Sequence, residues 1–488
     1  MNKRKENDLK EMSRKERKEY KKKRNFNKEF SIVTYSFVFI FILLIGYLIY
    51  FNIVRADSYV KSPYNARQDS YAKHVVKGNI LDKDANVLAK TEFADDGSEY
   101  RVYPYGNLYS HVVGYSAYGK GGLESRLNTD LLTSHSFVLD KIKREFHDEK
   151  QIGDNVITTL DTRLQTAASE ALGNQKGAVV AIEPSTGKIL AMVSKPDYDP
   201  NSVVENWEAL NSSEDSVMLN RATKGQYVPG STFKVVSALE FMRENPDFEN
   251  YSYDCSGTIE HEGVSISCYN HTAHGVVSLR DSLAVSCNTS FSNIGLNLNT
   301  KSFIKTSEEL LFDKSLPGGF GSPKSSVGLT KDGTDADKMM TAMGQGRIQV
   351  SPYHMALIAS AIANGGTLME PYIVDTIVND TGTKVKSTTP SVYKKLMTAD
   401  ESSFLKAAMT DVVDHGTATN LGRNGYDVAG KTGTAEYSSD KEKNHSWFIG
   451  FTNPDNPEVA ISVIIESSDG NAVASAIAGA VFDAYYYN

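Results

Sequence analysis

Residues 227–242 read YVPGSTFKVVSALEFM and combine a chain break, a serine, a lysine and a strongly apolar helix. Pro229 and Gly230 interrupt regular structure, so Ser231 is expected in the first turn of the buried helix that follows. Backbone N–H groups in a first helical turn lack a partner within the helix and can face a developing oxyanion. Lys234 follows one turn later among apolar neighbours, which favour a neutral amine that can act as a base.

The spacing of Ser231 and Lys234 is weak evidence by itself. A serine hydroxyl needs a neighbouring base to become a good nucleophile, and the S-x-x-K pattern places a lysine within reach on a helix. However, the pattern occurs eight times in this chain. A helix-capping serine beside a surface lysine is the ordinary alternative, so other motifs must decide.

Two further motifs occur once each and in a fixed order after Ser231. Ser286-Cys287-Asn288 follows an apolar segment and supplies a hydroxyl that can pass a proton and an amide that can bind a peptide group. Lys431-Thr432-Gly433-Thr434 supplies a cation, two hydroxyls and a glycine, which lets a substrate backbone approach closely. The ordered set S-x-x-K, S-x-N and K-T-G is far more specific than any one of its parts.

With PGSTFK and AGKTGTAE written out in full, this set resembles the penicillin-binding transpeptidase family. The segments RATKGQYVPGSTFK, CYNHTAHGVVSLRDSLAVSCNTSF, MGQGRIQVSPYHMA and HSWFIGF are similar to the family as well. Tyr64-Asn65-x-Arg67 followed by KGNILDKDANVLA looks like the pedestal signature of the class B members, with Lys77 where the family usually has arginine. No sequence typical of a glycosyltransferase domain lies between the apolar N-terminal segment and this signature, which disfavours class A.

The resemblance implies a D,D-transpeptidase that cross-links peptidoglycan stem peptides and is acylated by β-lactams. Ser231 would attack the penultimate D-alanine carbonyl while Lys234 takes its proton. Ser286 and Lys431 would pass a proton to the leaving D-alanine. An amine of a second stem peptide would then accept the acyl group, and neither a metal nor an organic cofactor is implied.

The resemblance also implies how the substrate is held. Asn288 would orient Lys234 and the substrate amide. Thr432, Gly433 and Thr434 would bind the substrate strand, with the two threonine hydroxyls on its terminal carboxylate. The backbone N–H groups of Ser231 and Thr434 would form the oxyanion hole.

The segments around the motifs predict an α+β fold, and the resemblance implies that it is of the penicillin-binding and serine β-lactamase type. Short apolar runs that alternate with polar residues or flank turns predict strands, and apolar residues at helical spacing predict helices. Strands near both ends of the domain would join one sheet. The expected elements are a hairpin over 75–91 with its turn at 82–86, a strand at 156–161, a helix over 162–173, strand pairs within 177–194 and 445–467, and a terminal helix over 475–487.

The N-terminal region predicts a membrane anchor. Residues 1–29 carry 13 Lys/Arg and 6 Asp/Glu, whereas the whole chain has a net charge of -8, so the body is acidic and nucleic-acid binding is not expected. Residues 30–54 contain no charge and are long enough to span a bilayer. Cationic residues before the span predict a cytoplasmic N-terminus and an exported body, and an uncleaved anchor is favoured over a signal peptide.

The expected organisation therefore has four parts. Residues 1–29 form a basic cytoplasmic tail and 30–54 the transmembrane anchor. Residues 55–155 form a small pedestal domain, and 156–488 form the transpeptidase domain. Because class B members generally work with a polytopic membrane glycosyltransferase, such a partner is expected at the anchor and pedestal.

The three cysteines leave two interpretations open. Cys255 and Cys268 could form a disulfide across a hairpin and leave Cys287 free, or all three could be small buried thiols. The absence of C-x-x-C spacing argues against a zinc site. His271 and His274 could suggest a metal pair, but without a partner cluster in the sequence a loop histidine pair is the favoured interpretation.

Other functions share part of the pattern. Residues 425–432 match the P-loop pattern G-x-x-x-x-G-K-[ST], but a polar segment follows where a P-loop needs a helix. A serine β-lactamase, a D,D-carboxypeptidase and a β-lactam sensor share the three motifs but lack the pedestal. A non-enzymatic scaffold of a wall-synthesis complex is less compatible with complete motifs. Glu436, two residues after Thr434, is the nearest acidic candidate for a hydrolytic base.

Overall fold

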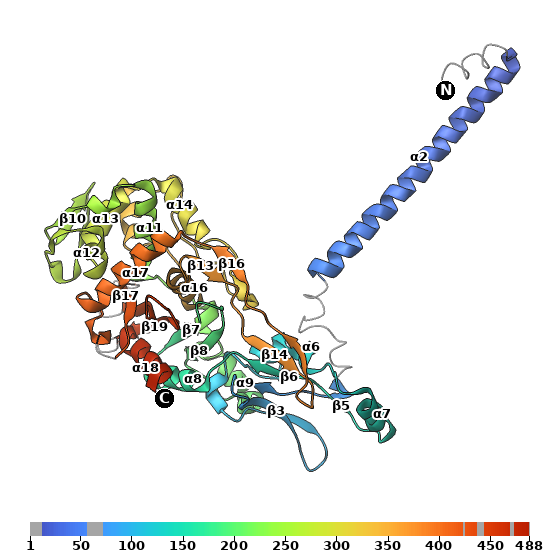
Figure 1. Cartoon of the computed structure of the whole chain (residues 1–488), viewed down its shortest axis with the longest axis horizontal. Helices are drawn as coiled ribbons and strands as arrows, with labels where there is room; N and C mark the ends of the chain where they lie inside the picture. Colours follow the sequence, from blue (N-terminus) through green and yellow to red (C-terminus); the bar gives the residue numbers. More distant parts are fainter. Residues whose placement is uncertain (1–11, 56–71, 423–424, 437–443, 469–472, 488) are drawn as a thin grey trace. The chain divides into compact units, whose positions relative to one another are not determined.

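The structure is a computed structural model that describes residues 12–55, 72–422, 425–436, 444–468 and 473–487 (Figure 1). The chain divides into two compact units, Met1–Asn65 and Ala66–Asn488. The pedestal signature at Tyr64-Asn65-x-Arg67 and the first part of the basic tail lie outside the described residues.

The first unit contains one long helix, α2, which spans Arg14–Tyr50 and continues as the π-helix η1 over Phe51–Arg55. Ser13 begins α2 with a capping box. Its hydroxyl accepts a hydrogen bond from the backbone N–H of Glu16, and the Glu16 carboxylate accepts one from the backbone N–H of Ser13. The apolar side chains from Phe30 onward are exposed, as they are in a helix that contacts lipid. Among the described residues, α2 with η1 is the one helix long and apolar enough to cross a membrane, as the sequence predicted.

The second unit is built on a five-stranded sheet that joins distant parts of the chain. The strands lie in the order β17 (Val428–Glu436), β18 (Asn444–Thr452), β19 (Ala460–Ser468), β7 (Gly177–Ile182) and β8 (Ile189–Lys195). All neighbouring strands are antiparallel. This arrangement confirms the predicted strand pairs and the predicted α+β sheet that unites both ends of the domain.

Helices cover both faces of this sheet (Figure 1). Helices α8 (Thr162–Leu172) and α18 (Ala474–Tyr487) pack together on one face, and α16 (Pro352–Ala363) packs on the other. Successive residues of β7 point to opposite faces of the sheet. Val179 packs in one hydrophobic cluster with residues of α8 and α18, whereas Val180 packs in another with residues of α16. Both faces of the sheet are therefore buried.

A helical region continues the domain beyond α16. Its main helices are α11 (Lys234–Glu244), α12 (Leu279–Ala284), α13 (Asn288–Asn297), α14 (Thr300–Glu309) and α17 (Ala399–Asp414). Helix α17 contacts both α12 and β17, so it connects the helical region to the sheet. The motifs found in the sequence lie where these two regions meet.

A second sheet lies in the pedestal region and has six strands. Their order is β15 (Lys384–Ser387), β14 (Val374–Val378), β6 (Asn155–Thr158), β2 (Ile80–Leu81), β3 (Val87–Phe93) and β4 (Glu99–Val102). The antiparallel β2–β3 pair confirms the predicted hairpin. Because β14 and β15 come from far along the chain, this sheet crosses the boundary expected at residue 155.

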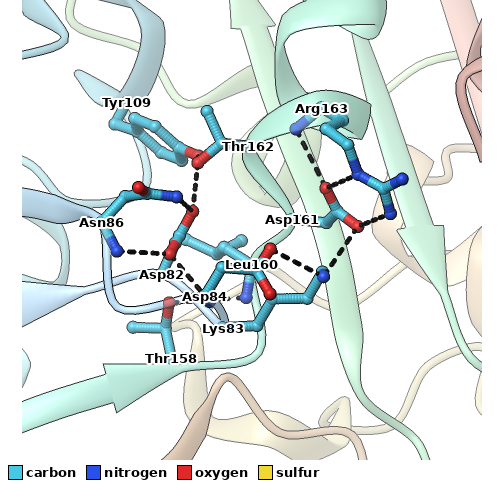
Figure 2. Close-up of polar contacts among 10 residues, drawn as sticks. All are labelled: Asp82, Lys83, Asp84, Asn86, Tyr109, Thr158, Leu160, Asp161, Thr162 and Arg163. Carbon is cyan, nitrogen blue, oxygen red and sulfur yellow. Dashed lines mark hydrogen bonds and ion pairs between the residues drawn. The ribbon is translucent and has the colours of Figure 1, made fainter. Parts of the chain in front are cut away.

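The turn of this hairpin is bound to the start of α8 by a buried carboxylate (Figure 2). Asp82 is fully buried and accepts hydrogen bonds from the backbone N–H groups of Asp84 and Asn86, at 2.9 and 2.8 Å. Its other oxygen accepts from the Asn86 amide at 2.8 Å and from the Thr162 hydroxyl. Tyr109 also bonds Thr162, at 2.8 Å, so the Asp82 carboxylate belongs to a polar network that connects the hairpin to the start of α8.

Lys77, which replaces the arginine usual in the pedestal signature, keeps an ion pair in this structure. Its amine lies 2.5 Å from the buried carboxylate of Glu124, which also pairs with Arg101 at 2.7 Å. Burial lowers the pKa of Lys77 to about 8, while the adjacent Glu124 charge acts against that shift. A lysine therefore provides an ionic contact to Glu124 at this position.

Candidate active site

Ser231 lies in a tight turn that leads directly into α11. The turn is the 3-10 helix η4 over Gly230–Phe233, so the predicted position at the start of a buried helix is correct. Gly230 has a φ of 56°, and a Cβ there would lie 2.4 Å from the carbonyl oxygen of Thr434. A glycine is required because the turn presses against strand β17, and the serine itself stays half-buried.

Lys234 is buried and points its amine at the S-x-N motif. Its Nζ donates to the carbonyl oxygen and the Oγ of Ser286 at 2.8 and 3.2 Å, and to Asn288 Oδ1 at 2.7 Å. Burial lowers the pKa of Lys234 to about 7. Within the described part of the chain, none of its hydrogen bonds reaches the Ser231 hydroxyl, although such bonds often form only when substrate binds.

Ser286 occupies a conformation that non-glycine residues seldom adopt. It lies in the short connection between α12 and α13 with a φ of 56°. Hydrogen bonds on either side hold it there, from Ser286 N to Leu283 O at 3.2 Å and from Cys287 N to Ser282 O at 2.9 Å. Strained backbone of this kind is concentrated at functional sites, because the surrounding structure must stabilise it.

Lys431 reaches the same hydroxyl from the sheet. Its Nζ donates to Ser286 Oγ at 2.9 Å and to the Thr432 carbonyl at 3.0 Å, and its side chain is fully buried. Burial lowers the pKa of Lys431 well below its usual value, and the charge of Lys234 acts in the same direction. A single hydroxyl therefore lies between two desolvated amines from different elements.

Strand β17 presents its free edge to the serine turn. It is the edge strand of the sheet, and among the described residues β18 is its one strand partner. A Cβ on Gly433 would lie 2.9 Å from the carbonyl oxygen of Pro229, which shows how closely strand and turn approach. Thr434 is exposed beside this contact, and Thr432 bonds the Thr417 hydroxyl at 2.5 Å.

The structure excludes the P-loop arrangement. A phosphate-binding loop runs from a strand into a helix, whereas Lys431 and Thr432 lie inside β17, which continues in extended form to Glu436. The match of residues 425–432 to the P-loop pattern is therefore a chance sequence match.

Some residues beside the site were not identified from the sequence. Gly344 has a φ of 88°, and a Cβ there would lie 1.8 Å from the carbonyl oxygen of Gly230. Its neighbour Gln345 donates to the Thr434 carbonyl at 3.3 Å, and Thr417 bonds Thr432. In the sequence, the run Gly344-Gln345-Gly346 predicts only a tight loop, because the residue types do not reveal what that loop contacts.

The cysteines are free and buried, and they lie together. Cys255, Cys268 and Cys287 form one cluster, and His274 lies beside it. The sulfur of Cys268 is 3.7 Å from each of the other two sulfurs, so no disulfide is present. The sequence shows no partner cluster for His271 and His274 and so favours a loop histidine pair, but folding places His274 beside the three cysteines.

Comparison with known proteins agrees with this arrangement of motifs and sheets. Residues 177–486 match the penicillin binding protein transpeptidase domain, and residues 77–156 match the penicillin binding protein A dimerisation domain. Peptidoglycan D,D-transpeptidase PbpA of Mycolicibacterium smegmatis is 31% identical over 482 residues, which cover 92% of this chain and 95% of the relative. Stage V sporulation protein D of Bacillus subtilis is 30% identical over 472 residues, which cover 86% of this chain and 70% of the relative.

Solved structures show the same fold. Penicillin-binding protein A from M. tuberculosis, in its imipenem acyl-enzyme complex, superposes with a TM-score of 0.77 at 30% identity, over 85% of this chain and 99% of that one. The match extends across both the pedestal and the transpeptidase regions. The chain belongs to the penicillin-binding transpeptidase family and is a class B penicillin-binding protein.

Proposed function

We propose that Ser231 is the nucleophile of this serine-type peptidoglycan D,D-transpeptidase, and that β-lactams acylate the same oxygen. The observation that carries the proposal is the position of Ser286 Oγ, which lies 3.2 Å from Lys234 Nζ and 2.9 Å from Lys431 Nζ. These three groups form a continuous path for a proton beside the Ser231 turn. Relatives named peptidoglycan D,D-transpeptidase support the substrate class.

Acylation begins when Ser231 Oγ attacks the penultimate D-alanine carbonyl of a stem peptide. Lys234 accepts the hydroxyl proton, which requires a neutral amine, and burial of Lys234 favours that form. The carbonyl oxygen becomes an oxyanion that accepts from the backbone N–H groups of Ser231 and Thr434. The close approach of β17 to the turn, marked by Gly230 and Gly433, supports this placement.

Collapse of the oxyanion breaks the amide bond and releases D-alanine. The departing nitrogen takes a proton that passes through Ser286 from Lys234, with Lys431 holding the Ser286 hydroxyl. The acyl group then rests on Ser231 as an ester. An amine of a second stem peptide attacks this ester, its proton returns along the same path, and a new amide cross-link leaves Ser231 free.

Residues beside the Ser231 turn bind the donor peptide. Asn288 bonds Lys234 through its oxygen and the Ser267 carbonyl through its amide, at 2.7 and 3.1 Å, so its orientation is set by two contacts. Thr432 and Thr434 offer hydroxyls to the terminal carboxylate, and Gly433 keeps the strand clear for the substrate backbone.

Replacement of the nucleophile tests the assignment. The full-length chain in detergent is incubated with a fluorescent penicillin, and covalent labelling is read on a denaturing gel. Ser231→Ala should abolish labelling. Ser185→Ala is the matched control, because Ser185 also begins an S-x-x-K pattern but is exposed in the turn after β7, so it should label like the wild type. Labelling of Ser231→Ala would overturn the assignment.

We further propose the domain limits and topology that the sequence predicted. Residues 1–29 form a cytoplasmic tail, 30–54 the membrane anchor, 55–155 the pedestal and 156–488 the transpeptidase domain in the exported body. Strands β14 and β15 then belong to the transpeptidase domain by sequence and complete the pedestal sheet.

A polytopic membrane glycosyltransferase is the proposed partner of the anchor and pedestal. Helix α7 (Val138–Phe146) supports this proposal because it carries an exposed apolar face, with Leu139 66% and Phe146 86% exposed. Leu123 of the pedestal is buried and therefore unsuited to crosslinking.

Photocrosslinking in cells tests the partner. A photoreactive amino acid at Leu139 should capture a membrane glycosyltransferase, whereas one at Lys384, exposed on β15, should not. Failure of the Leu139 position to yield this partner would contradict the proposal.

A further inference from the structure

A carboxylate on the five-stranded sheet holds the segment that leads into the Ser231 turn. Glu466 lies on β19, and its Oε1 atom accepts hydrogen bonds from the Tyr227 hydroxyl at 2.5 Å and from Arg221 Nε at 2.8 Å. Arg221 and Tyr227 are 4% and 8% exposed. One oxygen of the sheet therefore binds both ends of the segment 221–227, and that segment ends four residues before Ser231.

Aromatic side chains of β18 support Tyr227 beside this bond. Its ring packs edge-to-face against His445 and Trp447, with centroids 5.5 and 6.1 Å apart. The indole Nε1 of Trp447 donates to the Val228 carbonyl oxygen at 3.0 Å. Trp447 also lies opposite Gly433 in the pairing of β18 with β17. The same indole therefore connects the backbone before the nucleophile to the strand that carries the K-T-G motif.

These contacts bear on the spacing of the two oxyanion donors. The backbone N–H groups assigned to the oxyanion hole come from different elements, Ser231 from η4 and Thr434 from β17. Because the two residues are far apart in the sequence, their spacing depends on the contacts that hold the turn against the sheet. Donors stabilise an oxyanion only at about 2.7–3.1 Å, so a small displacement of the turn weakens the oxyanion hole.

We propose that Tyr227 and Glu466 are positioning residues that set the geometry of the oxyanion hole. Both side chains act through the backbone that leads into the Ser231 turn, and not on the reacting atoms. The inference rests on the proposed function, because it takes Ser231 as the nucleophile. The competing explanation is an ordinary structural bond, which would stabilise the fold without changing the reactivity of the folded enzyme.

Loss of the Tyr227 hydroxyl should affect acylation more than binding. The tetrahedral intermediate needs both oxyanion donors, whereas the β-lactam binds first through other groups of the site. Interactions that strengthen only in the transition state change the rate and leave ground-state binding unaltered. A displacement of about 1 Å lowers a rate by as much as 10²-fold.

Tyr227→Phe tests the proposal on the full-length chain in detergent. Rapid mixing with a fluorescent penicillin separates the noncovalent dissociation constant from the acylation rate constant. The rate constant should fall roughly 10–100-fold while the dissociation constant stays unchanged. Tyr198→Phe is the matched control, because the buried Tyr198 hydroxyl donates to the carbonyl of a pedestal residue, Ser110, at 2.8 Å. It should be acylated at the wild-type rate.

Variants of Glu466 test the partner of the bond. Glu466→Ala should slow acylation as Tyr227→Phe does. The double variant should be no slower than the slower single variant, because both changes remove one bond. Glu466→Gln keeps an oxygen that accepts from Tyr227 and should restore most of the rate. If Glu466→Ala fails to fold because Arg221 loses its ionic partner, Tyr227→Phe still decides.

A boronic acid supplies a readout that fold stability does not move. Ser231 Oγ adds to boron, its proton passes to Lys234, and the tetrahedral adduct places an oxygen in the oxyanion hole. In Tyr227→Phe, boronate affinity should fall by the same factor as the acylation rate constant. A wild-type rate constant or a wild-type boronate affinity in this variant would overturn the proposal. Labelling of Ser231→Ala would instead refute the nucleophile, so the two failures are distinguishable.

Discussion

Lys234 and Lys431 are fully buried amines that share one hydroxyl. Two charged ammonium groups this close would repel each other and lose their hydration, so the fold favours neutral amines at both positions. Ser286 contributes a hydroxyl that can both accept and donate a proton. The reactivity of the site thus depends on burial as much as on residue type.

Acylation should therefore depend on pH through Lys234. Because burial lowers the pKa of Lys234 to about 7, its base form is scarce below that pH and predominant above it. The rate of fluorescent-penicillin labelling should rise ~10-fold between about pH 6 and pH 8 and then level off. A rate that stays flat across this range would contradict the assignment of Lys234 as the base.

Lys234→Arg separates charge from basicity. Arginine keeps the positive charge but does not deprotonate, so acylation should slow by roughly 10²–10⁴-fold. Lys224→Arg, an exposed lysine on α10 (Arg221–Lys224), is the matched control and should leave the rate unchanged. Thermal unfolding of both variants verifies that the fold is intact.

Among the secondary-structure elements, the hairpin β2–β3 is joined to the start of helix α8 by the Asp82 carboxylate and by an ion pair between Lys83 and Asp161 at 3.4 Å. Asp82 accepts bonds from both its own turn and the Thr162 hydroxyl at the first residue of α8 (Figure 2). The pedestal sheet and the transpeptidase region therefore meet through a buried polar network. Such networks specify one arrangement because a lost partner leaves a buried group unsatisfied.

Asp82→Asn should lower the free energy of unfolding by about 1–3 kcal/mol. The amide that replaces one oxygen cannot accept from Asn86 or Thr162, so buried donors lose their partner. Asp84→Asn is the control, because Asp84 is 56% exposed and its ion pair with Lys83 lies at the surface. Denaturant unfolding of both variants measures the difference, and equal stabilities would refute the role of Asp82.

At the scale of the whole molecule, one apolar helix precedes a large folded body. Helix α2 begins in a basic region and continues through the uncharged span at 30–54, whereas the body carries a net negative charge. Basic residues beside a membrane span remain on the cytoplasmic side. In the proposed topology, the substrate and the β-lactams therefore reach the body on the other side of the membrane.

Protease added to intact cells should digest the body and spare the tail. One epitope is placed on the basic tail and another near the C-terminus. Immunoblotting for each epitope shows which part of the chain the protease has digested. Loss of the C-terminal epitope with retention of the tail is expected. Release of the body into the medium without protease would instead indicate a cleaved signal.

The lifetime of the penicilloyl adduct distinguishes a transpeptidase from a β-lactamase. Hydrolysis needs a base that activates water, and the defining residues of the three motifs include two lysines, two serines and an asparagine but no carboxylate. The adduct on Ser231 should persist for many minutes by intact-protein mass spectrometry. Glu436→Gln should not lengthen that lifetime, although Glu436 follows the motif on β17. Decay within seconds with multiple turnovers would favour a β-lactamase.

The sequence alone determined the local parts of this protein. Ser231 and Lys234 are close because three residues separate them at the start of a helix, and the hairpin at 82–86 follows from its turn residues. Such features depend on residues adjacent in the sequence and on the periodicity of apolar residues, and both can be read directly from the sequence. The family resemblance carried by the ordered motifs, and not their spacing, also implied that Ser286 and Lys431 would meet.

Tertiary structure decided the contacts whose partners are far apart in sequence. The Lys431–Ser286 bond depends on where an edge strand lies relative to a helix connection, and the Asp82–Thr162 bond depends on how a hairpin packs on α8. The cluster of Cys268 and Cys287 with His274 follows from two strand pairings. These pair β9 (Tyr253–Cys255) with β12 (Gly275–Val277), and β10 (Thr258–His261) with β11 (Val264–Ser267). No spacing rule predicts these positions, because burial and strand order, and not sequence distance, bring the side chains together.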